Sequence, residues 1–181
     1  MLKKDNNMKV LEVFFDDPLP EGIGFQLREI SRKINLAPKS VKIYLQKLEN
    51  DNLIMKKEHR IHKYPVYYAN QDNDYFRFLK KLDVIRRINE SGLIGYISDR
   101  CMPEVIILFG SASRGEDIKN SDIDLYIQSG EKKLKLNKYE KKLKRRINPF
   151  FEKDFDKLSS ELKTNIINGF KHQGYLKVKF S

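Results

Sequence analysis

The chain is poor in the residues that build disulfides and metal clusters: its 181 residues include one cysteine, three histidines and no tryptophan. A single cysteine, Cys101, excludes an internal disulfide and any zinc site built on several cysteines. No apolar run approaches the roughly 18 residues that a membrane-spanning helix needs, and no apolar stretch of signal-peptide length follows the basic start. We therefore expect a cytoplasmic protein with no membrane partner, in which Cys101 is a buried or idle thiol.

Most of the excess positive charge lies in the last part of the chain. The net charge is +11, and residues 131–181 contribute +9 of it, with 15 Lys and Arg against 6 Asp and Glu. A basic surface attracts polyanions such as nucleic acids or nucleoside triphosphates. The densest stretch, residues 132–146, fits a solvated helix face as well as a nucleic-acid-binding patch, so both interpretations stay open.

Apolar residues are abundant enough, at 40 % of the chain, to build a core in one mid-sized domain or two small ones. In the first part of the chain their spacing predicts helices over 8–15, 25–34 and 39–50. Pro38 suits the first turn of the third helix, because its missing N–H has no partner there. Two short strands, 53–57 and 65–69, then surround a basic tip and predict a β-hairpin.

This order of elements resembles the winged helix-turn-helix family over residues 8–69. The resemblance rests on Leu27-Arg28-Glu29-Ile30, Ser40-Val41, Leu45-x-x-Leu48 and Leu53-Ile54. It implies double-stranded DNA as a partner, with the third helix reading the major groove. The residues predicted to contact DNA are Lys39, Ser40, Lys42, Tyr44 and Lys47 in that helix, and Arg60 and Lys63 at the tip. A winged helix used for protein contacts is the alternative.

The middle of the chain is predicted to be a helical linker. Polar residues 70–73 come first, and Asp74 could cap a long helix over 75–91. A shorter amphipathic piece, 93–99, follows. We therefore expect a winged helix-turn-helix domain at 1–70, a helical linker at 71–103 and a further domain at 104–181.

That further domain has the pattern of an α+β fold, a mixed sheet flanked by helices. Residues 105–109 are continuously apolar, as in a strand buried on both faces. A short helix is expected at 111–114, a second strand at 123–127 and a helix at 137–146. Pro149 confines a third strand, 147–151, to a sheet edge or shortens it, and residues 155–170 and the tail that follows look mainly helical or extended.

Gly110 and Ser111 end the first of these strands and begin a helix. Exposed backbone N–H groups and the helix dipole attract phosphate at such a turn. Gly110 lets a triphosphate approach the backbone closely, and Ser111 adds a hydroxyl donor. Arg114 shares the helical face and could hold a phosphate oxygen by two hydrogen bonds.

Asp122 and Asp124 lie two residues apart on a strand, so their carboxylates point to the same side. Two carboxylates so close repel each other, and a divalent cation relieves the repulsion. Magnesium takes oxygen ligands from one or two carboxylates together with phosphates and water. The spacing therefore predicts a magnesium site, with room for two ions, next to the phosphate-binding turn.

The ordered set resembles the nucleotidyltransferases of the DNA polymerase β superfamily, in their minimal branch. Its signature is Gly110-Ser111, ten residues, then Asp122-x-Asp124, with Phe109, Arg114-Gly115, Asp117, Ser121 and Leu125 as flanking matches. The resemblance implies Mg²⁺, ATP or another nucleoside triphosphate, and two catalytic, metal-binding aspartates. A third carboxylate on a later strand usually completes such a site, but Asn148 stands there unless Glu152, Asp154 or Asp156 takes its place.

Two functions follow as hypotheses. The first is magnesium-dependent nucleotidyl transfer, by analogy with minimal nucleotidyltransferases an adenylyl transfer from ATP to a hydroxyl of a toxin-like protein partner. The second is a DNA-binding transcriptional regulator that binds its operator as a homodimer and whose nucleotidyltransferase domain is an impaired nucleotide sensor; Asn148 favours it. An RNA-tailing or tRNA nucleotidyltransferase ranks lower, because the chain is short for the extra substrate domains of those enzymes.

Overall fold

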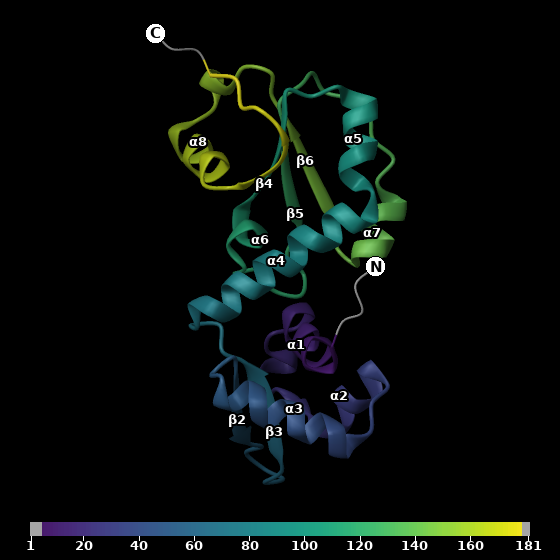
Figure 1. Ribbon diagram of the computed structural model, residues 1–181. Helices are drawn as coiled ribbons and strands as arrows, with labels where there is room; N and C mark the ends of the chain where they lie inside the picture. Colours follow the sequence, from purple (N-terminus) through teal and green to yellow (C-terminus); the bar gives the residue numbers. More distant parts are fainter. Residues whose placement is uncertain (1–4, 179–181) are drawn as a thin grey trace. The chain divides into compact units, whose positions relative to one another are not determined.

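The computed structural model describes residues 5–178, and the chain divides after Lys80 into two compact units (Figure 1). The division falls inside one helix, α4 (Asp74–Ser91), ten residues beyond the boundary that the polar segment 70–73 suggested.

Three helices build most of the N-terminal unit: α1 (Asn6–Asp16), α2 (Leu27–Ile34) and α3 (Pro38–Asn50), with a 3-10 turn, η1 (Pro20–Gly22), after the first. Asp5 begins α1 by accepting a hydrogen bond from the Met8 amide at 2.7 Å. The expected apolar face of α3 is confirmed, because Val41, Leu45 and Leu48 are completely buried. These side chains join α1 and α2 in one core.

An antiparallel sheet completes this unit, with strand order β1-β3-β2. Its strands are β1 (Phe25–Gln26), β2 (Ile54–Glu58) and β3 (Pro65–Ala69). The predicted hairpin is therefore confirmed, but the start of the second helix was wrong. Phe25 pairs with Tyr67 as a strand residue, and α2 begins only after Gln26, whose amide donates to the Glu29 carboxylate at 2.6 Å.

The polar segment before α4 is anchored rather than extended. The side-chain amide of Asn70 donates to the Asn52 carbonyl at 3.0 Å, and Asn70 is buried. The capping residue of α4 is Asn73, whose side chain accepts from the Phe76 amide at 3.0 Å. The expectation that Asp74 caps this helix was wrong by one residue.

Helices α4 and α5 (Leu93–Cys101) are not a bare connector. Phe76 belongs to the N-terminal core. Val84, Ile88 and Ile97 belong to the core of the C-terminal unit. Each part of these helices thus buries apolar side chains in the core of the unit in which it lies. Such packing is the main source of helix stability in proteins.

A four-stranded sheet forms the centre of the C-terminal unit, in the order β6-β5-β4-β7. Its strands are β4 (Val105–Phe109), β5 (Ile123–Ile127), β6 (Ile147–Phe151) and β7 (Phe170–Gly174). β4 is antiparallel to β5 and β7, whereas β5 and β6 are parallel. The predicted edge position of 147–151 is confirmed; the strand β7 was not predicted.

Helices cover both faces of this sheet (Figure 1). α5 and α7 (Asn137–Leu143) lie over one face. Their buried side chains pack against those that β4 and β5 direct to this face. The other face holds Tyr126 with Phe155 of a 3-10 turn, η2 (Phe155–Lys157), and Ile166 of α8 (Ser160–Ile167). α7 ends at Leu143, earlier than expected, because Lys144 takes a left-handed backbone conformation.

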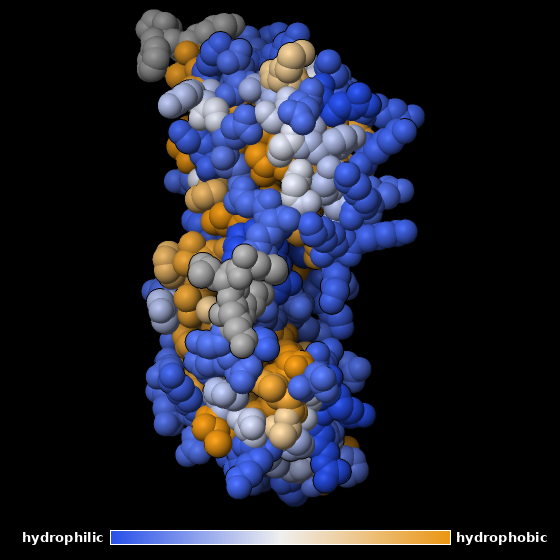
Figure 2. All heavy atoms as spheres, turned by 45° about the vertical axis from the view of Figure 1, so that its right-hand side comes forward, coloured by the Kyte–Doolittle hydropathy of each residue, from blue (hydrophilic) through white to orange (hydrophobic). Residues whose placement is uncertain are grey.

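The surface turned forward in Figure 2 is mainly hydrophilic, with hydrophobic patches between. Among the described residues, no helix is both long and apolar enough to cross a membrane. Cys101 is buried as expected, and burial raises the pKa of its thiol.

Candidate functional site

The end of β4 and the start of β5 meet at Gly110 and Asp124. Phe109 pairs with Asp124 across the two strands, and α6 (Gly110–Arg114) begins directly after β4. Gly110 has φ +71°, and a Cβ at this position would lie 2.6 Å from Oδ2 of Asp124. Glycine is favoured here, since the backbone is left-handed and any Cβ would force the Asp124 carboxylate to move.

Only one of the two aspartates lies on a strand. Ile123 and Leu125 of β5 are buried in the core under α5 and α7, so Asp124 between them points to the opposite face. The expectation that both aspartates lie on the strand was wrong for Asp122, which directly precedes β5. Both are half-buried. Among residues 5–178, no basic side chain forms an ion pair with either carboxylate.

The neighbour of Asp124 on β6 is Asn148, not an acid. The two residues are register partners in the parallel pair, and the Asn148 side-chain amide donates to Oδ1 of Asp124 at 2.9 Å. The sequence pattern had placed an asparagine where a third carboxylate was expected, and the structure brings that asparagine to the carboxylates. Asparagine can ligate a cation through its oxygen but cannot accept a proton at neutral pH.

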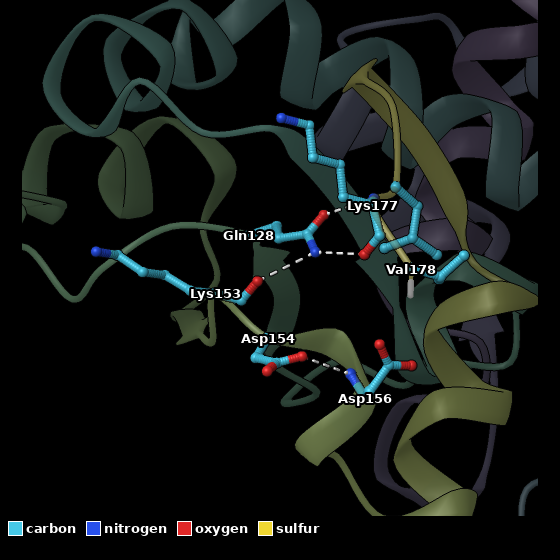
Figure 3. Close-up of a pocket in the computed structure, with 7 residues that line it drawn as sticks. Gln128, Lys153, Asp154, Asp156, Lys177 and Val178 are labelled. Atoms are coloured by element: carbon cyan, nitrogen blue, oxygen red, sulfur yellow. Dashed lines mark hydrogen bonds between the residues drawn. The ribbon is translucent and has the colours of Figure 1, made fainter. Parts of the chain in front are cut away.

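The other candidate acids lie at the opposite end of the sheet. Glu152 follows β6 directly, where Phe151 pairs with Ile127, the last residue of β5. Asp154 and Asp156 line a cavity of about 650 Å³ beside Gln128, and the Asp156 amide donates to Asp154 (Figure 3). Since Asp124 stands near the start of β5, none of these acids completes its site.

Arg145 holds the loop that leads into Asp122. Its guanidinium donates to the Asp117 carboxylate at 2.7 Å, to the Ser121 carbonyl at 2.8 Å and to the Asp122 carbonyl at 3.2 Å. The Asp117 side chain is only 3 % exposed. Sequence reasoning missed Arg145, because nothing in the basic stretch 132–146 distinguishes it from its exposed neighbours.

The remaining predicted phosphate contacts are near the site but differ in availability. Ser111 is half-buried in the first turn of α6. Arg114 is exposed, and its Nε donates to Glu116 at 2.7 Å in a surface ion pair. Such pairs contribute little and exchange readily, so Arg114 would have to leave Glu116 to bind a phosphate.

The residues predicted to contact DNA are arranged less simply than expected. Lys39, Lys42 and Lys47 are exposed on α3, and Arg60 and Lys63 are exposed at the hairpin tip. Ser40 is half-buried. Tyr44 packs against the N-terminal core instead of facing out.

Residues 91–174 match the family model described as polymerase beta, nucleotidyltransferase. The segment that is similar to this family lies in the C-terminal unit. The match covers less than half of the chain and includes both strands that bear the candidate site. Comparisons with curated proteins and with solved structures gave no significant match.

The donors Asp122 and Asp124 suit magnesium better than zinc. Among the described residues, no group of three or more histidine, cysteine, aspartate or glutamate side chains could hold a metal. Asp122 and Asp124 offer carboxylate oxygens only. Two carboxylates completed by water and substrate phosphates are an ordinary magnesium site, so the residues present fit that ion in the presence of a triphosphate.

Proposed function

We propose that the C-terminal unit binds a nucleoside triphosphate with magnesium and transfers its nucleotidyl group to a hydroxyl. The observation that carries this proposal is that the Asp124 carboxylate lies directly against Gly110. A Cβ added to Gly110 would be 2.6 Å from Oδ2 of Asp124. It brings a metal-binding oxygen and the start of α6 together, so that one triphosphate can contact both. The family match supports nucleotidyl transfer as the chemistry.

The protein's part in this reaction is mainly placement. Gly110 and Ser111 would hold the phosphates with backbone N–H groups and a hydroxyl, while Asp122 and Asp124 would hold the cation. Bound magnesium supplies positive charge that stabilises the phosphate oxygens as the acceptor oxygen bonds to the α-phosphorus and pyrophosphate leaves. Arg145 keeps Asp122 in place through its backbone carbonyl (Nη2 to O, 3.2 Å).

The acceptor's proton has no carboxylate to receive it beside Asp124. General-base catalysis contributes roughly 10²–10⁴-fold, so transfer by this chain should be slow unless the acceptor brings a base. We propose ATP as the nucleotide and a protein hydroxyl as the acceptor, which is the antitoxin-like reading suggested by the resemblance to minimal nucleotidyltransferases.

Labelled ATP tests this proposal. The protein is incubated with the label and magnesium, alone and with candidate protein partners, and covalent label is measured. Asn148→Asp should raise labelling by roughly 100-fold, because it restores a base beside Asp124. Asp122→Asn with Asp124→Asn should abolish both labelling and magnesium-dependent ATP binding. ATP binding unchanged in this double variant would refute the site.

A second function is favoured by Asn148 itself. A nucleotidyltransferase domain that holds a nucleotide without fast transfer can act as a sensor, and the N-terminal unit would then bind an operator, as a homodimer on a palindrome. A gel shift with the chain's own upstream DNA, with and without Mg–ATP, separates the two. Nucleotide-dependent DNA affinity with no label transfer supports the regulator.

DNA binding by the N-terminal unit is likewise a proposal. It is supported by the order α1, α2, α3, β2, β3, which is that of a winged helix-turn-helix. It is also supported by Lys39, Lys42 and Lys47, which share the outer side of α3. Exposed lysines on a helix of 13 residues suit contact with phosphates on both sides of a major groove.

A further inference from the structure

The outer face of α3 is a continuous stripe at helical spacing. It consists of Lys39, Lys42, Ile43, Gln46 and Lys47, all exposed. Residues three and four apart are neighbours on a helix surface. Ile43 and Gln46 therefore adjoin, and Lys39 and Lys47 lie one turn before and one turn after Ile43.

Ile43 stands out on this stripe. It is a large apolar residue, 63 % exposed, among lysines, while Tyr44 beside it is turned into the core. The Gln46 amide is equally available, because among residues 5–178 no group hydrogen-bonds to its side chain. The centre of the face thus presents one methyl-rich group and one amide, with positive charges around them.

We propose that Ile43 and Gln46 read adjacent A·T base pairs in the major groove of duplex DNA. This inference rests on the proposed DNA binding of the N-terminal unit and names what that unit recognises. A primary amide matches the N6 donor and N7 acceptor of adenine, and an apolar side chain matches the thymine methyl group. Neither group matches the paired acceptors of guanine, for which arginine or lysine is the usual partner.

The lysines have a different part in the same contact. Lys39, Lys42 and Lys47 surround the two reading residues and would neutralise phosphates, which sets affinity and its salt dependence but not sequence preference. Charge complementarity also argues for DNA over an apolar protein surface, since the exposed residues of this stripe include three cations and no acid.

The first experiment is a selection from duplexes with a randomised central segment, using the full chain. The wild type should enrich sites with two adjacent A·T pairs. Gln46→Ala should lose the preference at one position, a change of roughly 5- to 100-fold. Gln71→Ala is the matched control, because Gln71 is an exposed glutamine outside α3 and should select the wild-type sites.

The second experiment replaces thymine by uracil in the enriched site, which removes only the methyl group. Wild-type affinity should fall about fourfold, whereas Ile43→Ala should bind both duplexes alike. Ile118→Ala, which alters an exposed isoleucine of the C-terminal unit, should keep the fourfold difference. Both reading residues are exposed, so the variants should fold; far-ultraviolet circular dichroism checks this.

The outcomes separate this inference from the function on which it rests. If the wild type binds no duplex, or binds only a protein partner, the DNA-binding proposal itself is wrong and this inference falls with it. If the wild type binds duplexes but enriches G·C pairs, or if Gln46→Ala and Ile43→Ala select the wild-type sites, DNA binding stands and the assignment of readers is overturned.

Discussion

The two ends of strand β5 carry polar groups of opposite character. At its start, Asp124 has one neutral partner, the Asn148 amide at 2.9 Å. Just beyond its other end, the Gln128 side chain makes three hydrogen bonds to backbone groups of Lys153 and Lys177, at 2.7–3.2 Å (Figure 3). At the first end, the carboxylate end, no basic side chain of the described residues pairs with Asp124, so its negative charge is available to a cation. At the second, the structural end, the hydrogen-bonding groups of Gln128 are used to fix the chain.

This difference shows why a count of acids is a poor guide to a site. Three acids, Glu152, Asp154 and Asp156, would supply enough carboxylates for a metal centre. They lie, however, at the structural end of β5, near Gln128. Asp154 accepts from the Asp156 amide and so begins the η2 turn. Asp122 and Asp124 are fewer, yet they stand just before and within the buried strand β5, beside the turn at Gly110. The predictions below test this contrast, from the largest effect to the smallest.

Removing the guanidinium that supports the carboxylate end should have the largest effect. Arg145→Ala leaves Asp117, 3 % exposed, without this partner, and breaking a buried pair costs about 3–5 kcal/mol. Urea unfolding followed by tyrosine fluorescence measures it, since the chain has no tryptophan. Lys141→Ala, at an exposed lysine, is the control. A loss below about 1 kcal/mol would mean that the loop is held by other contacts.

Acid should weaken the sheet at its edge strand β7. His172 is the extra residue of a bulge in β7, its ring nitrogens are buried without hydrogen bonds, and burial lowers its pKa from 6.5 to about 4. The unfolded chain binds the proton first, so stability is full above pH 6.5 and falls as the pH drops toward 4. The loss approaches about 3 kcal/mol at most.

Unfolding at several pH values checks this, with His172→Phe as the reference. In that variant the loss between pH 6.5 and 4 should shrink. An equal loss in both proteins would assign the acid sensitivity to other groups.

Two glycines offer a direct comparison of the ends. Gly110→Ala forces a side chain into a left-handed backbone and against Asp124, and should cost about 1–2 kcal/mol. It should also weaken Mg–ATP binding at least about tenfold by displacing the carboxylate. Gly130→Ala meets only the flexible end of Lys153, at 3.0 Å, and should change neither quantity. Calorimetric titration with Mg–ATP measures the binding; equal affinities in the two variants would contradict the contrast.

The last prediction concerns the structural end, where stability should fall but Mg–ATP binding should not change. Gln128→Leu removes the hydrogen bonds to Lys153 and Lys177 and should cost about 1–2 kcal/mol. Mg–ATP affinity should stay at the wild-type value, because the change lies at the far end of β5. A clear drop in that affinity would show that the two ends are coupled.

Local patterns in the sequence predicted much of this fold. The apolar run 105–109, the strand 123–127 and the edge position of Pro149 were found from periodicity and backbone rules. β7 was missed because Lys171, His172 and Gln173 carry no strand signal; this edge strand exists through its pairing with β4, a contact distant in sequence. The same reason explains Phe25, which pairs with Tyr67 although its spacing fits the following helix.

The part of the candidate site that consists of residues close together in the sequence could be predicted. Gly110, Ser111, Asp122 and Asp124 stand in one short segment, so their spacing predicted that the turn and the carboxylates lie close together, and Gly110 does lie beside Asp124. Whether Asn148 or Glu152 faces Asp124 depends on the register of β6, which only the folded sheet decides. The role of Arg145 depends on contacts with Asp117 and Asp122 across a loop and a helix, and no local pattern reports them.

Pro149 has one more consequence, which concerns the chemical ageing of the protein. Asparagine commonly deamidates to aspartate when the backbone nitrogen of the next residue attacks its side-chain amide. Proline has no N–H to lose, so this route is closed at Asn148. A stored sample should therefore not acquire the missing acid by itself, and label transfer that grows with the age of a preparation would have another origin.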